Sequence, residues 1–261
     1  MEEALVTAVD DGPARRLTLN SPANRNSLSK PLLEQLSWEL ERAAATSGVR
    51  VVVLAHTGPV FCAGADMSEQ LASSAKSGTS PGAGALVPIL ELLERIPQPV
   101  VAEVRGPVRG GGMGLVAAAD IALCCTTANF AFSEIRVGVA PAVIAVTVLA
   151  RISRSAALDL FLTGRKFGAD EALRIGLVTK VVPVGHEAAE TTRAVEELAA
   201  GAPLAQREIK RLVREVPNMD QAAAYQRMVA LSRRLFSSPE GQEGMRAFRE
   251  HRAPVWPSDG E

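Results

Sequence analysis

Continuous apolar runs alternate with segments of helical periodicity along the first 183 residues of the chain. Runs rich in β-branched residues, such as 49–55, are typical of strands buried on both faces of a parallel sheet. The segments 4–9 and 15–19 flank the turn residues 10–13 and predict a hairpin. Further strands are predicted at 49–55, 99–104, 121–125 and 177–182. Strands that alternate with helices favour an α/β fold.

Helices are predicted where apolar residues recur every three or four positions. Ser29 precedes Pro31 and a series of leucines at helical spacing, which predicts a helix start, and Gly48 marks its end. The remaining helices are predicted at 86–96, from the glycines 110–112 to Asp120, and at 141–151, 155–163 and 169–175. The segment 73–84 is rich in Ser, Ala and Gly and predicts a mobile surface loop.

The sequence changes character after Pro183. From there to about His251 it is charged and helical, without a good strand candidate. We therefore predict an α/β core over residues 1–183 and a helical C-terminal region over residues 184–261. No internal repeat at the periods of solenoid proteins is visible.

Composition excludes several classes of partner. The chain has 261 residues, of which 47% are hydrophobic, and its 28 basic and 29 acidic side chains give a net charge of −1. Without a cluster of Lys and Arg, we expect no binding to nucleic acid or to an anionic membrane. The longest apolar stretch, 137–150, is shorter than the roughly 20 residues of a membrane helix, and no signal peptide is visible. We expect a soluble, cytoplasmic protein.

Cysteine and histidine positions give no indication of a metal site. Cys62, Cys124 and Cys125 lack the spacing of zinc ligands, and the three histidines are far apart without acidic or cysteine companions. We interpret the cysteines as reduced packing residues and the histidines as surface or structural residues.

Two glycine-rich turns are candidates for a binding site. The segment 61–66 follows the strand 49–55, and the glycines 110–112 follow the strand 99–104. Open α/β sheets bind ligands at the carboxyl ends of their strands, and the amides of a helix N-terminus favour an anion or an oxyanion. The alternative is that the glycines only permit tight turns. The spacing of dinucleotide-binding, P-loop and serine-hydrolase motifs is absent from the sequence.

Glu134 is the candidate acid/base residue. It lies in the apolar segment 130–135, and burial there would raise its pKa and allow it to exchange protons near neutral pH. The alternative is a solvated turn or a salt bridge to Arg136.

Taken together, these motifs resemble the crotonase superfamily, also called the enoyl-CoA hydratase/isomerase family. The resemblance covers nearly the whole chain. Its motifs, in order, are 20–28, Phe61-Cys62-Ala63-Gly64-Ala65-Asp66, 99–102 followed by Gly106 and the glycines 110–112, 119–121, 132–138, 162–164 and 172–178.

The resemblance implies a crotonase-like spiral of ββα turns with a helical C-terminal trimerisation region, in a homotrimer or a homohexamer. It implies an acyl-CoA thioester as substrate and no separate cofactor. The thioester carbonyl would lie between the backbone amides of Ala65 and Gly111. Coenzyme A would contact Arg25 through a phosphate, and Ala63, Gly64 and Asp66 through its adenine and pantetheine.

The chain departs from the family at one catalytic position. The best-known hydratases of the family use two glutamates, and these positions are Gly114 and Glu134 here. By resemblance we expect an enoyl-CoA hydratase that uses Glu134 as acid/base. A Δ3,Δ2-enoyl-CoA isomerase with Glu134 as its single base is the main alternative, and a catalytically silent acyl-CoA-binding protein is another. Gly112, Met113 and Gly114 would lie at the acyl pocket, where we expect Gly114 to leave room for a branched or carboxylated acyl group.

The segment 236–256 resembles the family's C-terminal tail, which packs over a coenzyme A site, sometimes that of a neighbouring subunit. The alternative is an amphipathic helix that buries Met245 and Phe248 in the core. We favour this second interpretation.

Overall fold

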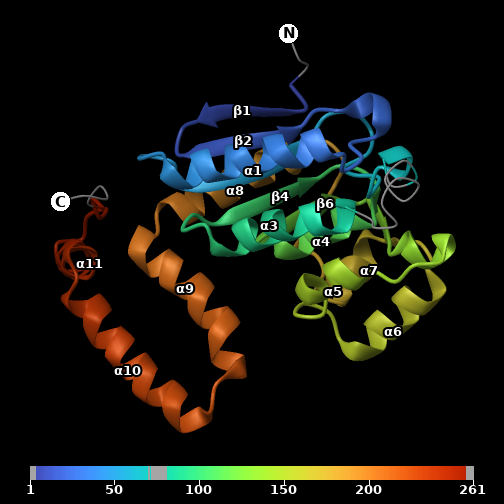
Figure 1. Ribbon diagram of the computed structural model, residues 1–261. Coiled ribbons are helices and arrows are strands. Elements are labelled where there is room, and N and C mark those ends of the chain that lie inside the picture. Colours follow the sequence, from blue (N-terminus) through green and yellow to red (C-terminus); the bar gives the residue numbers. More distant parts are fainter. Residues whose placement is uncertain (1–3, 70, 72–80, 257–261) are drawn as a thin grey trace.

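A six-stranded sheet forms the centre of the computed structural model, which describes residues 4–69, 71 and 81–256 (Figure 1). Its strand order is β1-β2-β3-β4-β6-β9, with β1 antiparallel to β2 and all other neighbours parallel. These strands are β1 (Val6–Asp11), β2 (Ala14–Leu19), β3 (Val51–His56), β4 (Val100–Val104), β6 (Ile121–Cys125) and β9 (Lys180–Val182). Every residue of β3 and β4 is buried, as their continuous apolar runs predict.

A second, smaller sheet has the order β5-β7-β8. Its strands are β5 (Val108–Arg109), β7 (Asn129–Ala131) and β8 (Phe167–Gly168). Strands of two or three residues are too short to show a periodic pattern, so the sequence did not predict them. Phe130 of β7 stacks on Phe167 of β8, with their ring centroids 5.6 Å apart.

Helices connect the strands and continue beyond them. They are α1 (Lys30–Ala45), α3 (Pro81–Arg95), α4 (Gly111–Ala118), α5 (Ala142–Val148), α6 (Arg154–Thr163), α7 (Ala169–Arg174), α8 (Glu187–Ala199), α9 (Pro203–Glu215), α10 (Gln221–Ser237) and α11 (Pro239–Arg249), with the 3-10 turns η1 (Pro22–Asn24), η2 (Ser133–Val137) and η3 (Val216–Asn218). The predicted α/β order is confirmed, with most boundaries displaced by a few residues.

Helix α3 corrects one prediction. Residues 81–84, predicted as part of a loop, form its first turn, while residues 73–80 of that predicted loop lie outside the described residues. Proline is well tolerated at the first helical position, so Pro81 is compatible with a helix start. Leu86, Leu90 and Leu93 are buried at helical spacing and pack in the main core, which outweighs the low helix propensity of the glycines and of Pro88.

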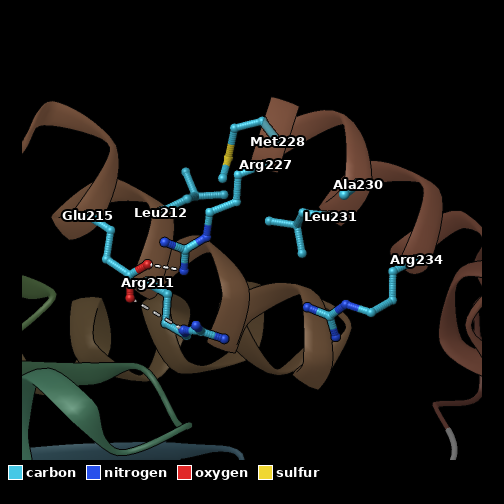
Figure 2. Close-up of a pocket in the computed structure, with 8 residues that line it drawn as sticks. All are labelled: Arg211, Leu212, Glu215, Arg227, Met228, Ala230, Leu231 and Arg234. Carbon is cyan, nitrogen blue, oxygen red and sulfur yellow. Dashed lines mark hydrogen bonds and ion pairs between the residues drawn. The ribbon is translucent and has the colours of Figure 1, made fainter. Parts of the chain in front are cut away.

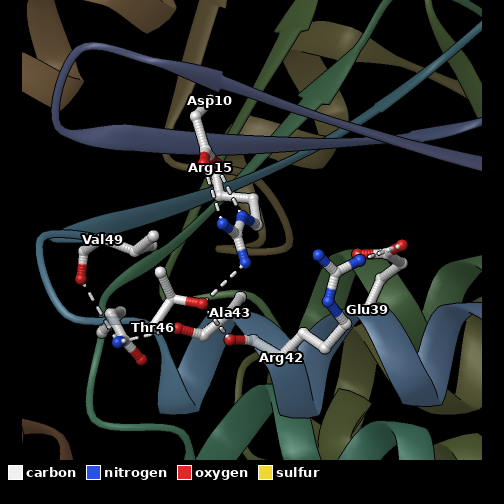
Figure 3. A network of polar contacts seen from close by, with 8 residues as sticks. Asp10, Arg15, Glu39, Arg42, Ala43, Thr46 and Val49 are labelled. Atoms are coloured by element: carbon white, nitrogen blue, oxygen red, sulfur yellow. Dashed lines mark hydrogen bonds and ion pairs between the residues drawn. The ribbon is translucent and has the colours of Figure 1, made fainter.

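Helix α1 is fixed at both ends. At its start, the Ser29 hydroxyl accepts a hydrogen bond from the Leu32 amide, as the N-cap prediction requires. Beyond its end, Arg15 donates to Asp10 (2.6 Å) and to the Thr46 hydroxyl (2.9 Å), which joins the helix to the β1–β2 hairpin (Figure 3). The hairpin and the helix therefore hold one edge of the sheet together.

The sheet is covered on both faces. Helices α1, α3 and α4 contribute to the main hydrophobic core on one face. On the other face, Ala194 and Val195 of α8 pack against Val51, Val53 and Val101. Cys62, Cys124 and Cys125 are buried and unpaired, which confirms that they are packing residues.

The structure also tests the expectations for the histidines, for a metal site and for a membrane helix. His56 is fully buried, and its Nε2 accepts a hydrogen bond from the Arg105 amide (3.1 Å), so it is a structural residue. No group of His, Cys, Asp and Glu side chains among the described residues is arranged to hold a metal ion. Nor is any helix in the described ranges both long and apolar enough to cross a lipid bilayer.

Beyond β9, the described chain is helical. Helix α8 packs on the sheet, whereas α9, α10 and α11 extend to one side of it (Figure 1). Met245 and Phe248 are 43% and 84% exposed, so the interpretation that buries them in the core is wrong. Helix α11 contacts α10, and Glu240 in its first turn accepts a hydrogen bond from the Leu204 amide of α9 (2.9 Å).

Lys210 attaches α9 to the core. Its ammonium group donates to the carbonyls of Leu93 (3.2 Å) and Gln98 (2.9 Å) and pairs with Asp120 (2.8 Å), while its side chain is only 9% exposed. A buried cation with three oxygen partners is a specific attachment point, because its removal takes a partner from two carbonyls and leaves the Asp120 carboxylate, which also accepts from the Val100 amide (2.7 Å), without its cation.

We expect Lys210→Met to destabilise the fold by roughly 3 kcal/mol, since breaking a buried charge network costs far more than breaking a surface pair. Urea denaturation followed by circular dichroism measures this loss. The control is Lys180→Met, which removes a more exposed ion pair with Glu190 and is expected to cost less than about 1 kcal/mol. An equal loss of unfolding free energy in the two variants would contradict the role of Lys210 in attaching α9 to the core.

Candidate active site

The two glycine-rich turns touch each other. Gly64 and Gly110 both adopt positive φ, at +94° and +51°. A Cβ atom on Gly110 would lie 3.3 Å from the Gly64 Cα, and one on Gly64 would lie 3.2 Å from the Arg109 carbonyl oxygen. Only glycine combines this backbone conformation with this close approach. The contact brings the next residues, Ala65 and Gly111, into the same region.

Cys62 holds the turns in register. Its carbonyl accepts a hydrogen bond from the Arg109 amide (2.9 Å), and its sulfur lies 3.4 Å from the Gly64 amide. A Cβ atom on Gly112 would lie 2.7 Å from the Cys62 Cβ, so the glycine leaves space for the thiol. Complete burial raises the pKa of Cys62 to about 12. Cys62 is therefore an inert packing residue between the turns.

The amides of Ala65 and Gly111 are available for a ligand. Gly111 is the first residue of α4, where N–H groups have no acceptor inside the helix. Ala65 is exposed, and its amide has no hydrogen-bond acceptor among the described residues. The preceding Gly64 carbonyl accepts from the Leu28 amide (2.8 Å), which fixes this turn against the segment before α1. Two such donors can stabilise an oxyanion, and that role stays a prediction here.

Glu134 lies beside these turns. It belongs to η2, and its Oε1 is 3.8 Å from the position of a Cβ atom on Gly110. Its Oε2 is buried and has no hydrogen-bond partner among the described residues. Burial raises the pKa of Glu134. Arg136 donates instead to the Thr163 carbonyl (2.8 Å), so the salt bridge considered as an alternative is not formed.

Gly114 does not open onto free space. A Cβ atom there would lie 2.6 Å from Cγ2 of Ile144 and 3.3 Å from Cδ2 of Leu90, and both of these side chains are buried. The expectation that Gly114 leaves room for a branched acyl group is therefore wrong, because α5 and α3 fill that volume. Met113 is fully buried in the main core.

Sequence reasoning missed Ile144 and Leu90 as the residues packed against Gly114. Each follows the ordinary apolar pattern of its helix, so neither stands out in one dimension. The available signal was Gly114 itself, since glycine inside a helix indicates close approach by another group. Gly114 indicates that another side chain packs against α4 at this position, but it does not identify that side chain.

The segment predicted to bind coenzyme A is attached to the first turn. Arg25 and Asn26 both have positive φ, at 59° and 54°, which costs roughly 1–3 kcal/mol per residue. The side-chain Nδ2 of Asn26 donates to the carbonyls of Thr57 (3.0 Å) and Val60 (2.8 Å), and the backbone amide of Ala63 donates to the Arg25 carbonyl (3.0 Å). Arg25 is exposed and lies next to Ala63, as a shared ligand would require.

Asp66 has a local structural role. Its carboxylate accepts hydrogen bonds from the amides of Ser68 (3.0 Å) and Glu69 (3.2 Å), and so caps the helical turn that begins at Met67. Hydrogen bonds from Ser68 lower the pKa of Asp66. Contact of Asp66 with coenzyme A stays a prediction.

The parallel strands β3 and β4 lead into two apposed glycine turns, and the Glu134 carboxyl group, with one buried oxygen, lies beside them. These features define an α/β protein with a candidate oxyanion site. A sequence model of the enoyl-CoA hydratase/isomerase family matches residues 14–259. The chain is 33% identical over 243 residues to enoyl-CoA hydratase EchA19 of Mycobacterium tuberculosis, covering 91% of each. It is 29% identical to the human mitochondrial enoyl-CoA hydratase domain-containing protein 3, covering 93% of this chain and 80% of the human one.

Solved structures show the same fold. The crystal structure of an enoyl-CoA hydratase from Mycobacterium smegmatis superposes with a TM-score of 0.92 at 31% identity, covering 97% of this chain and 99% of the other. The crystal structure of the human protein gives a TM-score of 0.91 at 28% identity, with 97% and 100% covered. The chain belongs to the enoyl-CoA hydratase/isomerase family and has the crotonase fold.

Glu134 should reduce stability above its ordinary pKa. Because its pKa is raised on folding, the folded protein binds more protons than the unfolded chain in the interval between the two values, and stability falls as pH rises through it. We expect Glu134→Gln to melt at a higher temperature than the wild type at about pH 8. The difference should disappear below the ordinary pKa of glutamate, about 4.3.

Thermal unfolding of both proteins from about pH 4 to pH 8 measures this effect. Glu91→Gln is the matched control, because Glu91 is an exposed residue of α3. A difference between Glu134→Gln and the wild type that does not change with pH would show that the carboxyl group is not protonated more readily in the folded state.

Proposed function

We propose that the chain hydrates a 2-enoyl-CoA thioester, with Glu134 as its acid/base residue and the amides of Ala65 and Gly111 as its oxyanion hole. One observation carries the proposal: the carboxyl group of Glu134 has a buried oxygen, Oε2, without a hydrogen-bond partner in the described structure, and it lies beside the turn that begins α4. A carboxyl group with a raised pKa exchanges protons efficiently near neutral pH.

The proposed reaction balances with one carboxylate. Glu134 accepts a proton from water as the oxygen forms a bond to the third acyl carbon. The electrons of the double bond move onto the thioester oxygen, where the two amides stabilise the enolate. The enolate collapses and the second carbon takes the proton from Glu134, which regenerates the carboxylate. The names of the Mycobacterium relatives, both enoyl-CoA hydratases, support this reaction.

Isomerisation of a 3-enoyl-CoA is the second candidate. It is favoured by the packing at Gly114, where Ile144 and Leu90 occupy the position of a second carboxylate. Glu134 would remove a proton from the second carbon and return it to the fourth, while the double bond moves from carbons three and four to carbons two and three. This reaction needs no water and no second acid/base group.

Coenzyme A would be bound as part of the substrate, with no separate cofactor. Two observations support contact of Arg25 with a phosphate group. Arg25 is exposed, and its carbonyl accepts a hydrogen bond from the Ala63 amide of the first glycine-rich turn. Gly64 and Asp66 would contact the adenine and pantetheine. A cytoplasmic location also belongs to this proposal.

The assay follows loss of the conjugated enoyl thioester of crotonyl-CoA by absorbance. We expect turnover by the wild type and a fall in kcat of about 10²–10⁴ in Glu134→Gln, the usual range for loss of a general acid/base. Glu91→Gln should retain wild-type activity. If crotonyl-CoA is unchanged but a 3-enoyl-CoA is converted, the isomerase is correct. If both bind and neither reacts, the chain is a silent acyl-CoA-binding protein.

Assembly into a homotrimer or a homohexamer is also proposed. Helices α9, α10 and α11 present large exposed apolar side chains, among them Val213, Phe236 and Phe248. These helices enclose an apolar groove of about 560 Å³, and Figure 2 shows a smaller pocket between α9 and α10 in which Glu215 pairs with Arg211 and Arg227. Exposed apolar side chains that gather on one part of a surface are typical of a protein interface.

Light scattering after size-exclusion chromatography tests the assembly. We expect a mass of three or six chains for the wild type, and dissociation of Phe248→Asp, since Phe248 is 84% exposed in a single chain. Val9→Asp, which changes an exposed valine on β1, is the control and should keep the wild-type mass. A monomeric wild type would contradict the proposal.

A further inference from the structure

An apolar wall runs along α4 from the proposed oxyanion hole. A Cβ atom on Gly111 would meet Leu28 (2.6 Å) and Leu86 (3.1 Å), and one on Gly114, nearly a turn later, would meet Ile144 and Leu90. Leu86 and Leu90 are themselves one turn apart on α3. Both glycines therefore face one continuous surface of buried aliphatic side chains.

We propose that Ile144 is a specificity-determining residue that makes the acyl pocket select unbranched over 3-branched acyl groups. This inference rests on the proposed function, because it takes the thioester oxygen to lie at the Gly111 amide. The proposal concerns the shape of the pocket and does not depend on whether the enzyme hydrates or isomerises its substrate.

The helix geometry relates Ile144 to particular acyl carbons. Gly114 lies three residues after Gly111, about 4.5 Å farther along the helix at 1.5 Å per residue. In an acyl chain that runs along α4 from the oxyanion hole, the third and fourth carbons reach the level of Gly114. These carbons then lie beside the volume that Ile144 and Leu90 fill, and a methyl branch at the third carbon meets that wall.

The wall is rigid. Ile144 is 3% exposed, and a β-branched side chain in a helix has one strongly preferred rotamer. The Thr147 hydroxyl, also buried, donates to the Ile144 carbonyl (3.1 Å) within α5. In a close-packed interior an added methyl group displaces neighbours instead of entering a gap, so a branched acyl group is disfavoured.

The contact with Gly114 involves particular atoms of Ile144. Its Cγ2 and Cβ are the two nearest atoms, at 2.6 and 3.1 Å from the Cβ position. Ile144→Val keeps both branches at Cβ, whereas Ile144→Ala removes them. Val148, on the same helix and fully buried, is absent from the atoms nearest to Gly114 and supplies the matched control Val148→Ala.

Isothermal titration with saturated thioesters, which can be neither hydrated nor isomerised, tests the inference. The probes are butanoyl-CoA and 3-methylbutanoyl-CoA, and the readout is the ratio of their Kd values. We expect the wild type to bind the unbranched thioester at least about tenfold more tightly, which is within the usual range for one carbon in an apolar pocket. Ile144→Ala should reduce the ratio to about one. Ile144→Val and Val148→Ala should keep the wild-type ratio.

Several outcomes would overturn the inference. These are equal binding of both thioesters by the wild type, an unchanged ratio in Ile144→Ala, or an equal change in Val148→Ala. The failure of the proposed function is distinguishable, because a wild type that binds neither thioester overturns the acyl-CoA site as a whole. Binding without discrimination overturns only the role of Ile144.

Discussion

The contact between the backbones of Gly64 and Gly110 is the constraint on which the site depends. The two turns follow neighbouring parallel strands, and they approach until a single Cβ atom on either residue would crowd the other. This approach brings the residues that follow, Ala65 and Gly111, into the same region. The buried Cys62 thiol and the Arg109–Cys62 hydrogen bond then fix the spacing. In the proposed oxyanion hole, this packing would hold the amides of Ala65 and Gly111 in place before a ligand arrives, which is the condition for stabilising developing charge.

Much of the fold could be predicted from the sequence because its central elements follow simple periodic rules. The continuous apolar run of β3 and the capped, leucine-rich α1 each carry a strong local signal. The short strands β5 and β7 carry none, because two or three residues do not define a period. The start of α3 was mispredicted because Gly82 and Gly84 belong to a segment rich in Ser, Ala and Gly, which indicates a loop locally, while packing of the leucines that follow stabilises a helix.

The sequence predicted two parts of the candidate site, namely the glycine-rich turns and the single glutamate, Glu134. Glycine turns after strands, and one glutamate in an apolar segment, are visible in one dimension. The packing of Ile144 against Gly114 is a contact between residues that are thirty positions apart, and the pattern of neither residue encodes it. Phe248 shows a related difficulty, since amphipathicity indicates that a helix has an apolar face but does not identify what covers it.

The site concentrates features that each reduce stability. Arg25 and Asn26 hold left-handed conformations, and Glu134 keeps a buried oxygen without a partner in the described structure. A large aliphatic core that includes α1, α3 and α4 offsets these costs, so the strain persists where the surroundings fix it. Filling the space at Gly114 with Ile144 and Leu90 adds to that core. A second carboxylate there would itself need a partner or a proton, whereas an aliphatic wall needs neither and leaves Glu134 as the site's predicted proton carrier.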